Sequence, residues 1–181
     1  KTLTRLGPGF RYAPTWSPDG KKLVFIDQAM RIHVVDRETG ATEAIDKAYH
    51  MFEGGLRSFA ASWSPDSRWI AYDRDIERGS RAIFLYDTRA KELHQVTTGF
   101  TTDSFPSFDP KGDYLYFLGN RHFAPSYSDF DNSWIYANST QILAVPLRRD
   151  VASPTAPRND AEGKDDEKGD GDKKPDDGKK D

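Results

Sequence analysis

Four histidines are the residues of this chain best suited to acid–base or metal chemistry: His33, His50, His94 and His122. No two of them stand at the i, i+4 spacing that lets a pair of imidazoles share one metal ion, and no Gly-x-Ser-x-Gly nucleophile motif occurs. His33 falls within one expected strand and His94 within an expected outer strand, which favours satisfied or exposed structural roles. His122, beside Arg121, is the best functional candidate, although the more favoured interpretation is a packed loop anchor.

Three other short patterns could suggest ligand binding. Asp129, Asp131 and Ser133 alternate like the start of a calcium loop, but the glycine and the final glutamate of such a loop are missing. Residues 7–9 (G-P-G) are typical of a turn rather than a phosphate loop, and residues 138–140 (N-S-T) are only a formal glycosylation sequence. We therefore predict no catalytic, cofactor-binding or metal-binding residue in this chain, and no cofactor.

The charged residues are distributed unevenly along the 181 residues. Residues 160–181 hold six Lys and ten Asp or Glu with no aromatic or β-branched residue, so this tail cannot bury enough apolar surface and is predicted to be disordered. Subtracting these from the totals of 26 basic and 29 acidic residues leaves 20 and 19. A nearly neutral body argues against nucleic-acid binding. The chain also lacks cysteine and any apolar run of 18 residues, so it predicts no disulfide and no membrane span.

A repeated motif organises the fold, and so it must position the residues that carry any function of the chain. W-S-P-D-G at residues 16–20 recurs as W-S-P-D-S at 63–67 and in degenerate form as F-D-P-K-G at 108–112, at spacings of 47 and 45 residues. Apolar runs rich in Val, Ile, Phe, Tyr and Trp follow each copy, which indicates about four strands per repeat. Repeats of this length and strand content are typical of β-propeller blades.

The predicted fold class is therefore all-β: an incomplete β-propeller of about three four-stranded antiparallel blades, WD40-like or PD40-like, with a disordered C-terminal tail. We place the blades near residues 7–46, 57–97 and 101–147. Residues 1–6 align with 91–96 and are expected to form the outer strand of a preceding blade. Residues 1–150 make up the partial propeller, and residues 151–181 form a proline-containing exit and a charged, disordered linker.

The motif residues have simple structural interpretations. The aromatic residues that open each copy are predicted to be wedges between neighbouring blades, the alternative being an aromatic ligand cage: Trp16, Trp63 and Phe108. The acidic residues of the motif are predicted to stabilise the turns: Asp19, Asp66 and Asp109. The first strand of each blade surrounds the propeller axis, so residues 11–15, 58–62 and 103–107 are expected to line a central channel.

The third repeat contains an insertion, residues 119–140, between its second and third strands. It is rich in aromatic residues, including Phe123, Phe130 and Trp134. A loop of this length in a compact fold is usually functional or a docking surface, and its aromatic content predicts that it packs on something.

The motif W-S-P-D-G-K-K-L-V-F resembles the TolB-type, or PD40, propeller repeat. The more specific resemblance lies in the last repeat: D-Y-L-Y-F-L-G-N-R-H-F-A-P-S-Y-S-D-F-D at 113–131, Q-I-L-A-V-P-L-R-R-D at 141–150, S-P at 153–154, and the charged tract after them. Together these resemble the end of the second, seven-bladed propeller of bacterial tricorn-type serine proteases. The resemblance covers essentially the whole chain.

This resemblance implies a non-catalytic propeller segment that gates or channels unfolded oligopeptides to a protease core lying outside it. The implied partners are peptide substrates in the propeller channel, downstream PDZ and protease domains of the same chain, and further copies in a homo-oligomer, with no nucleic acid and no membrane. The intact protein would be a serine-type peptidase, although none of the family's catalytic motifs falls in this region. A cytoplasmic location is implied, with the periplasm or secretion as alternatives.

Two other functions remain compatible with the repeats. One is a TolB-like protein-binding propeller scaffold. The other is the propeller of an α/β-hydrolase peptidase or of an amidohydrolase. Since the chain starts without a methionine and in the middle of the repeat pattern, we expect it to be a segment of a longer protein.

Three blades cannot close a ring, because propellers use four to eight. We therefore expect residues 1–150, expressed alone, to self-associate or aggregate through their open blade faces. Light scattering and analytical ultracentrifugation test this. A monodisperse monomer that melts cooperatively would contradict it.

Overall fold

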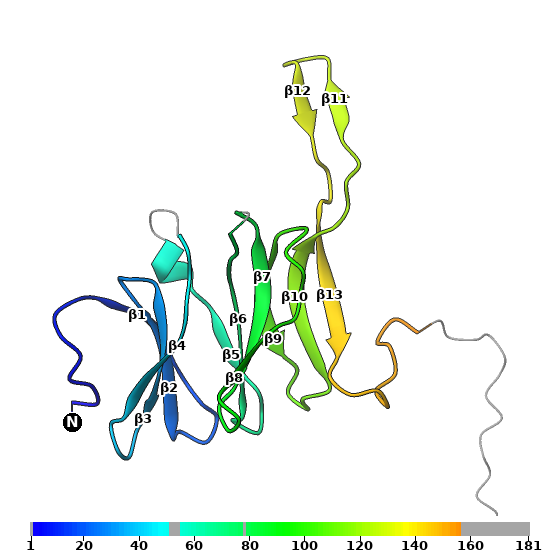
Figure 1. Cartoon of the computed structure of the whole chain (residues 1–181). Coiled ribbons are helices and arrows are strands. Elements are labelled where there is room, and N and C mark those ends of the chain that lie inside the picture. Colours follow the sequence, from blue (N-terminus) through cyan, green and yellow to red (C-terminus); the bar gives the residue numbers. More distant parts are fainter. Residues whose placement is uncertain (1, 51–54, 78, 157–181) are drawn as a thin grey trace, which may run out of the picture.

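The computed structural model describes residues 2–50, 55–77 and 79–156, in which three antiparallel sheets lie side by side and a separate two-stranded sheet projects beyond them (Figure 1). The strands of the first sheet follow one another in chain order: β1 (Arg11–Trp16), β2 (Lys22–Asp27), β3 (Arg31–Asp36) and β4 (Thr42–Lys47). A short 3-10 helix, Gly55–Ser58, leads into the second sheet, which has the same order: β5 (Ala61–Trp63), β6 (Trp69–Asp75), β7 (Arg81–Asp87) and β8 (Glu92–Gln95). This is the predicted all-β blade architecture.

The third sheet differs from the expected four strands. Within the described residues it contains only β9 (Asp103–Phe108), β10 (Tyr114–Asn120) and β13 (Thr140–Pro146). After β13 the Leu147 amide donates to the Asp113 carbonyl and the chain turns away, and Pro154 has no amide hydrogen to offer a ladder. The third blade, placed near residues 101–147, therefore has three strands rather than four within the described residues, and the predicted charged tail lies outside the described residues from 157 onward.

The N-terminal residues also differ from expectation. Residues 2–6 form no strand in the described structure, and the described sheets include no preceding blade to which they could add as an outer strand. Instead the Arg11 guanidinium donates to the carbonyls of Leu6 and Gly7 at 3.0 and 2.7 Å. The first and last divisions of the chain, at residues 6 and 150, stay predictions.

The turn that joins the first two strands of each sheet is built by the repeated motif. Lys21 donates its backbone amide to Asp19 Oδ1 at 3.0 Å, and the Ser17 hydroxyl donates to the same atom at 2.6 Å. Asp66 repeats these contacts in the second sheet with Ser64 and Arg68. In the third sheet Asp109 stands one residue after the aromatic position and accepts the amides of residues 111, 113 and 114. The predicted turn role of these acids is confirmed.

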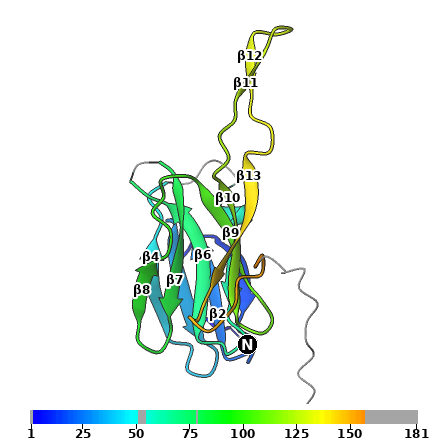
Figure 2. The same cartoon turned by 90° about the vertical axis from the view of Figure 1, so that its right-hand side faces the viewer.

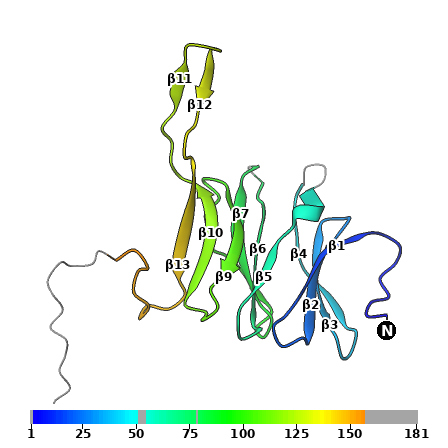
Figure 3. The same ribbon diagram turned by 180° about the vertical axis from the view of Figure 1, so that it is seen from behind.

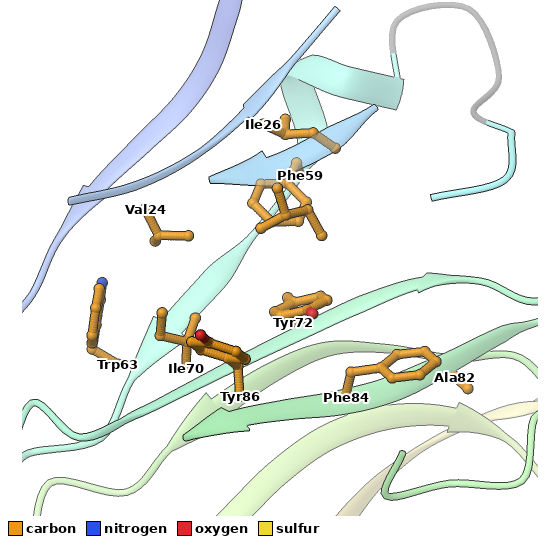
Figure 4. Close-up of a cluster of buried hydrophobic side chains, with 10 residues drawn as sticks. Val24, Ile26, Phe59, Trp63, Ile70, Tyr72, Ala82, Phe84 and Tyr86 are labelled. Carbon is orange, nitrogen blue, oxygen red and sulfur yellow. The ribbon is translucent and has the colours of Figure 1, made fainter. Parts of the chain in front are cut away.

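The core lies between the sheets rather than inside one of them. Alternate residues of β6 are buried on opposite faces, with Ile70 and Tyr72 toward the first sheet and Ala71 toward the third. Figure 4 shows Val24 and Ile26 of β2 facing the aromatic side chains of the second sheet. Every strand of the middle sheet except the outer β8 is therefore covered by a neighbour.

Trp63 confirms the predicted wedge. Its indole is only 7% exposed, and the ring nitrogen donates to the Thr15 carbonyl of the first sheet at 3.2 Å. Trp16 occupies the same motif position on the first sheet but is 46% exposed, because no described sheet covers it on that side.

A polar contact beside this cluster also joins the first two sheets. Asp46 Oδ2 of β4 accepts the Tyr72 hydroxyl at 2.9 Å and Arg74 Nε at 2.6 Å. Burial raises the pKa of Tyr72, so its hydroxyl stays protonated and keeps its role as donor. The Arg74 guanidinium lies 3.9 Å from the centre of the Phe84 ring, which adds a cation–π contact.

The β7–β8 turn depends on a buried carboxylate. Asp87 accepts Arg68 Nε at 3.1 and 3.0 Å from its two oxygens, and its Oδ1 accepts the amides of Arg89 and Ala90. The hydrogen bonds from Arg68, together with those two amides, hold the pKa of Asp87 far below its usual range.

We predict that Trp63→Phe destabilises the chain far more than Trp16→Phe does. The first change removes a buried hydrogen bond and part of a packed ring, which should cost about 1–2 kcal/mol and lower the melting temperature by roughly 3–6 °C. The second, at an exposed ring, should leave it nearly unchanged. Thermal unfolding followed by circular dichroism gives both values. Equal shifts would contradict the wedge role.

A second prediction concerns acid stability. Because the folded pKa of Asp87 is depressed, its stabilising contribution is present above the unfolded pKa of about 3.9 and is lost as the pH falls through the folded value. Asp87→Asn should cost about 2 kcal/mol near neutrality and should flatten the loss of stability below about pH 4. Urea unfolding at a series of pH values measures this, and parallel pH profiles for the two proteins would refute it.

Candidate functional site

The first strand of each sheet, β1, β5 or β9, lies at a sheet edge, and these three edges lie near one another. β5 contacts both β1 and β9, so the edges converge on one side of the molecule, as the view from behind shows (Figure 3). The segments expected to line a channel fall here: residues 11–15 in β1 and 103–107 in β9, while 58–62 run from the end of the 3-10 helix into β5. We call these segments the inner edges.

Two of the inner edges carry a β-bulge that was not predicted. The register of β1 on β2 shifts between Tyr12 and Thr15, and that of β9 on β10 shifts at the corresponding place. Ala13 and Phe105 have positive φ angles of 50° and 54°, a conformation that a bulky residue rarely adopts. Each is followed by a proline, and each stands three residues before the aromatic residue of its motif. This repeated X-Pro was the signal in the sequence.

The bulge in β9 is fixed by the neighbouring sheet. Asp73 Oδ1 of β6 accepts the Phe105 amide at 3.0 Å, and the Asp73 carboxylate forms an ion pair with Arg81. Asp73 is only 3% exposed, and burial raises its pKa despite the opposing effect of Arg81. Pro106 is buried while Phe105 is 51% exposed, so the backbone is held firmly and the ring is left uncovered.

A second ion pair fixes the start of the insertion. Asp103, buried at the start of β9, accepts Arg121 Nη2 at 3.1 Å. Arg121 also lies over the Phe117 ring, with its guanidinium carbon 5.7 Å from the ring centre. His122, the strongest functional candidate by sequence, is exposed immediately after this anchor, so Arg121 rather than His122 holds the loop.

The insertion forms a two-stranded hairpin, β11 (Ser126–Ser128) and β12 (Ser133–Ile135), that projects from the third sheet (Figures 1 and 2). Its aromatic residues pair within it: Tyr127 packs edge-on against Trp134 at 5.4 Å, and Phe123 lies 5.9 Å from Tyr136. Phe130, at the tip, is fully exposed. Packing of the hairpin on another surface stays a prediction.

The remaining histidines have structural positions. His33 is buried in β3, stacks on Phe25 and lies 2.9 Å from Asp27 Oδ2. Burial opposes the ionisation of Asp27, but the Arg31 amide and His33 outweigh this and lower its pKa. His50 contacts Asp75 on the neighbouring sheet, and His94 is exposed on the outer strand β8.

The calcium-like pattern forms a local turn instead. Asp131 Oδ1 accepts the Ser133 hydroxyl at 2.8 Å, within the hairpin. Nowhere in the described part of the chain do three His, Asp or Glu side chains gather closely enough to hold a metal ion. Membrane crossing by a helix is likewise unsupported, since the described residues include no helix of the required length and apolar character.

Four-stranded antiparallel sheets packed face to face, with their first strands together at one side, define the class: blades of a β-propeller. Comparison with protein families then identifies which family of propellers this is, because the model of the tricorn protease second β-propeller domain matches residues 1–180. This chain belongs to the tricorn protease second β-propeller family.

Individual relatives support the same family assignment. A tricorn protease of Thermoplasma volcanium is 34% identical over 172 residues, which cover 91% of this chain and 16% of that protein. Tricorn protease homolog 1 of Streptomyces coelicolor is 26% identical over 142 residues, 78% of this chain and 13% of that one. The chain thus spans about a sixth or less of the length of these relatives.

Among solved structures, the crystal structure of the tricorn protease superposes with a TM-score of 0.67 at 26% identity, covering 76% of this chain and 14% of that one. TolB from Acinetobacter baumannii gives a TM-score of 0.50 at 20% identity over 71% of this chain and 32% of TolB, which shows a shared fold alone.

Proposed function

We propose that this propeller segment controls access to a protease: its inner edges line part of a channel that admits extended oligopeptides and excludes folded protein. The observation that carries the proposal is the convergence of three free first-strand edges in a chain of the tricorn propeller family. A strand-lined opening accepts a single extended chain, whereas a folded domain is much wider than one strand.

The chemistry of the inner edges supports passage rather than capture. Their side chains are mostly small and uncharged, as at Ala13, Thr15, Ala60, Ser62 and Ser104. Small side chains leave room for a peptide, and few fixed charges face it. The edges are also poor templates for strand addition, because two contain a bulge with a proline and the third, β5, is only three residues long.

For the longer protein we propose a serine-type peptidase in which peptides reach downstream PDZ and protease domains through the propeller, assembled as a homo-oligomer. Family membership supports this, as does the small share of the relatives' length that the chain spans. We propose a cytoplasmic location, with the periplasm or secretion as the alternative.

The exposed hairpin favours a second candidate function, a protein-binding scaffold. Phe130 and Trp134 present apolar surface away from the sheets, as a docking element would. In that case changes in the hairpin, and not at the inner edges, would alter function.

A matched pair of substitutions in the longer protein tests the channel. Ala60 lies in the inner edge of the second sheet, immediately before β5, whereas Ala90 is exposed on the outer β7–β8 turn. Ala60→Arg should lower kcat/KM for long unfolded peptides by about ten-fold, a barrier of about 1.4 kcal/mol, and leave dipeptide-sized substrates less affected. Ala90→Arg should change neither. If kcat/KM is unchanged in Ala60→Arg for both peptide lengths, the proposed channel is wrong.

A further inference from the structure

We infer that Phe105 is an apolar contact point for the side chains of extended peptides that pass along the inner edges, an inference that rests on the proposed channel. The expected ligand is an unfolded oligopeptide carrying aliphatic or aromatic residues.

The backbone at Phe105 is strained, and the packing of its ring does not account for this strain. A φ of 54° places a bulky residue in the left-handed region, which is unfavourable for any side chain with a Cβ. Such outliers persist only where the surroundings enforce them, and they cluster at functional sites.

The surroundings of Phe105 do enforce the conformation. Asp73 Oδ1 accepts its amide at 3.0 Å, Arg81 pairs with the Asp73 carboxylate, and Pro106 is buried. A buried carboxylate is costly, as the raised pKa of Asp73 reflects. The fold thus commits an ion pair from the neighbouring sheet to hold one exposed residue.

The bulge itself does not need an aromatic ring. Ala13 occupies the corresponding bulge of the first sheet, with a φ of 50° and a proline after it. Because alanine suffices there, the Phe105 ring is an addition to the bulge rather than a requirement of it. Its exposed apolar surface therefore remains for a ligand.

The same bulge sets how a peptide can use this surface. Pro106 has no amide hydrogen, and the register shift interrupts the edge of β9, so a passing peptide cannot add as a continuous strand. Contact is then made through side chains. Such contact favours apolar residues and still permits release, which a channel needs.

Photo-crosslinking in the longer protein tests the inference without relying on protease activity. The photoreactive residue p-benzoylphenylalanine replaces Phe105, Ala60 or Phe130 in separate proteins. The probes are a biotinylated unfolded peptide rich in Leu and a second peptide with Gly at each Leu. We expect labelling at 60 and 105, with the Leu peptide preferred at 105, and little labelling at 130.

The outcomes separate the two proposals. Labelling at 60 but not at 105, or no preference for Leu at 105, overturns the role of Phe105 and leaves the channel standing. Absence of labelling at both inner-edge positions overturns both. Equal labelling at 130 indicates non-specific binding of the peptide to exposed apolar residues and also overturns the role of Phe105.

Substitutions give a quantitative arm, measured as binding of the two peptides by fluorescence anisotropy. Phe105→Ala should reduce the preference for the Leu peptide by about three- to ten-fold, as expected for losing one apolar side-chain contact, while Phe130→Ala should not. Asp73→Ala should reduce it as well, because the bulge loses its support. Asp73→Asn keeps an acceptor for the Phe105 amide and should retain the preference. An unaltered preference in Phe105→Ala would refute the inference.

Discussion

Packing of one sheet face on the next is the contact on which the rest of this structure depends. The middle sheet has two apolar faces, and the strands of its neighbours supply most of what covers them, with Phe59 before β5 completing the first cluster. Val24 and Ile26 cover one face, and Leu115 and Phe117 cover the other. The aromatic wedge, the motif turns and the interblade ion pairs all act at this interface. A blade is therefore a unit of repetition and not a unit of stability.

The sequence predicts this architecture well because its signals are local and repeated. A period of about 46 residues, strand-forming runs and a turn motif locate two complete sheets and the role of Trp63. The third sheet and the N-terminus show what local signals do not predict. Whether a strand forms beyond Pro146, or at residues 2–6, depends on a partner edge that no local pattern can supply.

The candidate site was predicted only in outline. The inner edges follow from blade geometry, so their location could be predicted from the repeat alone. The bulges at Ala13 and Phe105 were not predicted, although a shared X-Pro marks both, and at Phe105 the conformation also depends on Asp73 reaching across from another sheet. The hairpin was visible as an aromatic insertion, but its anchor is the pair Asp103–Arg121, whose members are 18 residues apart in sequence.

Three of the hydrogen bonds that join neighbouring sheets at the inner edges share one direction along the chain. Trp63 donates to Thr15, Phe108 donates its amide to Ser62, and Phe105 donates to Asp73, so in each case a later sheet uses an acceptor of the sheet before it. A polypeptide emerges from the ribosome N-terminus first, and the earlier acceptors are then already in place. Each new repeat can dock on the one before it as soon as it is synthesised, so the uncovered face at the growing end moves along the chain as translation continues.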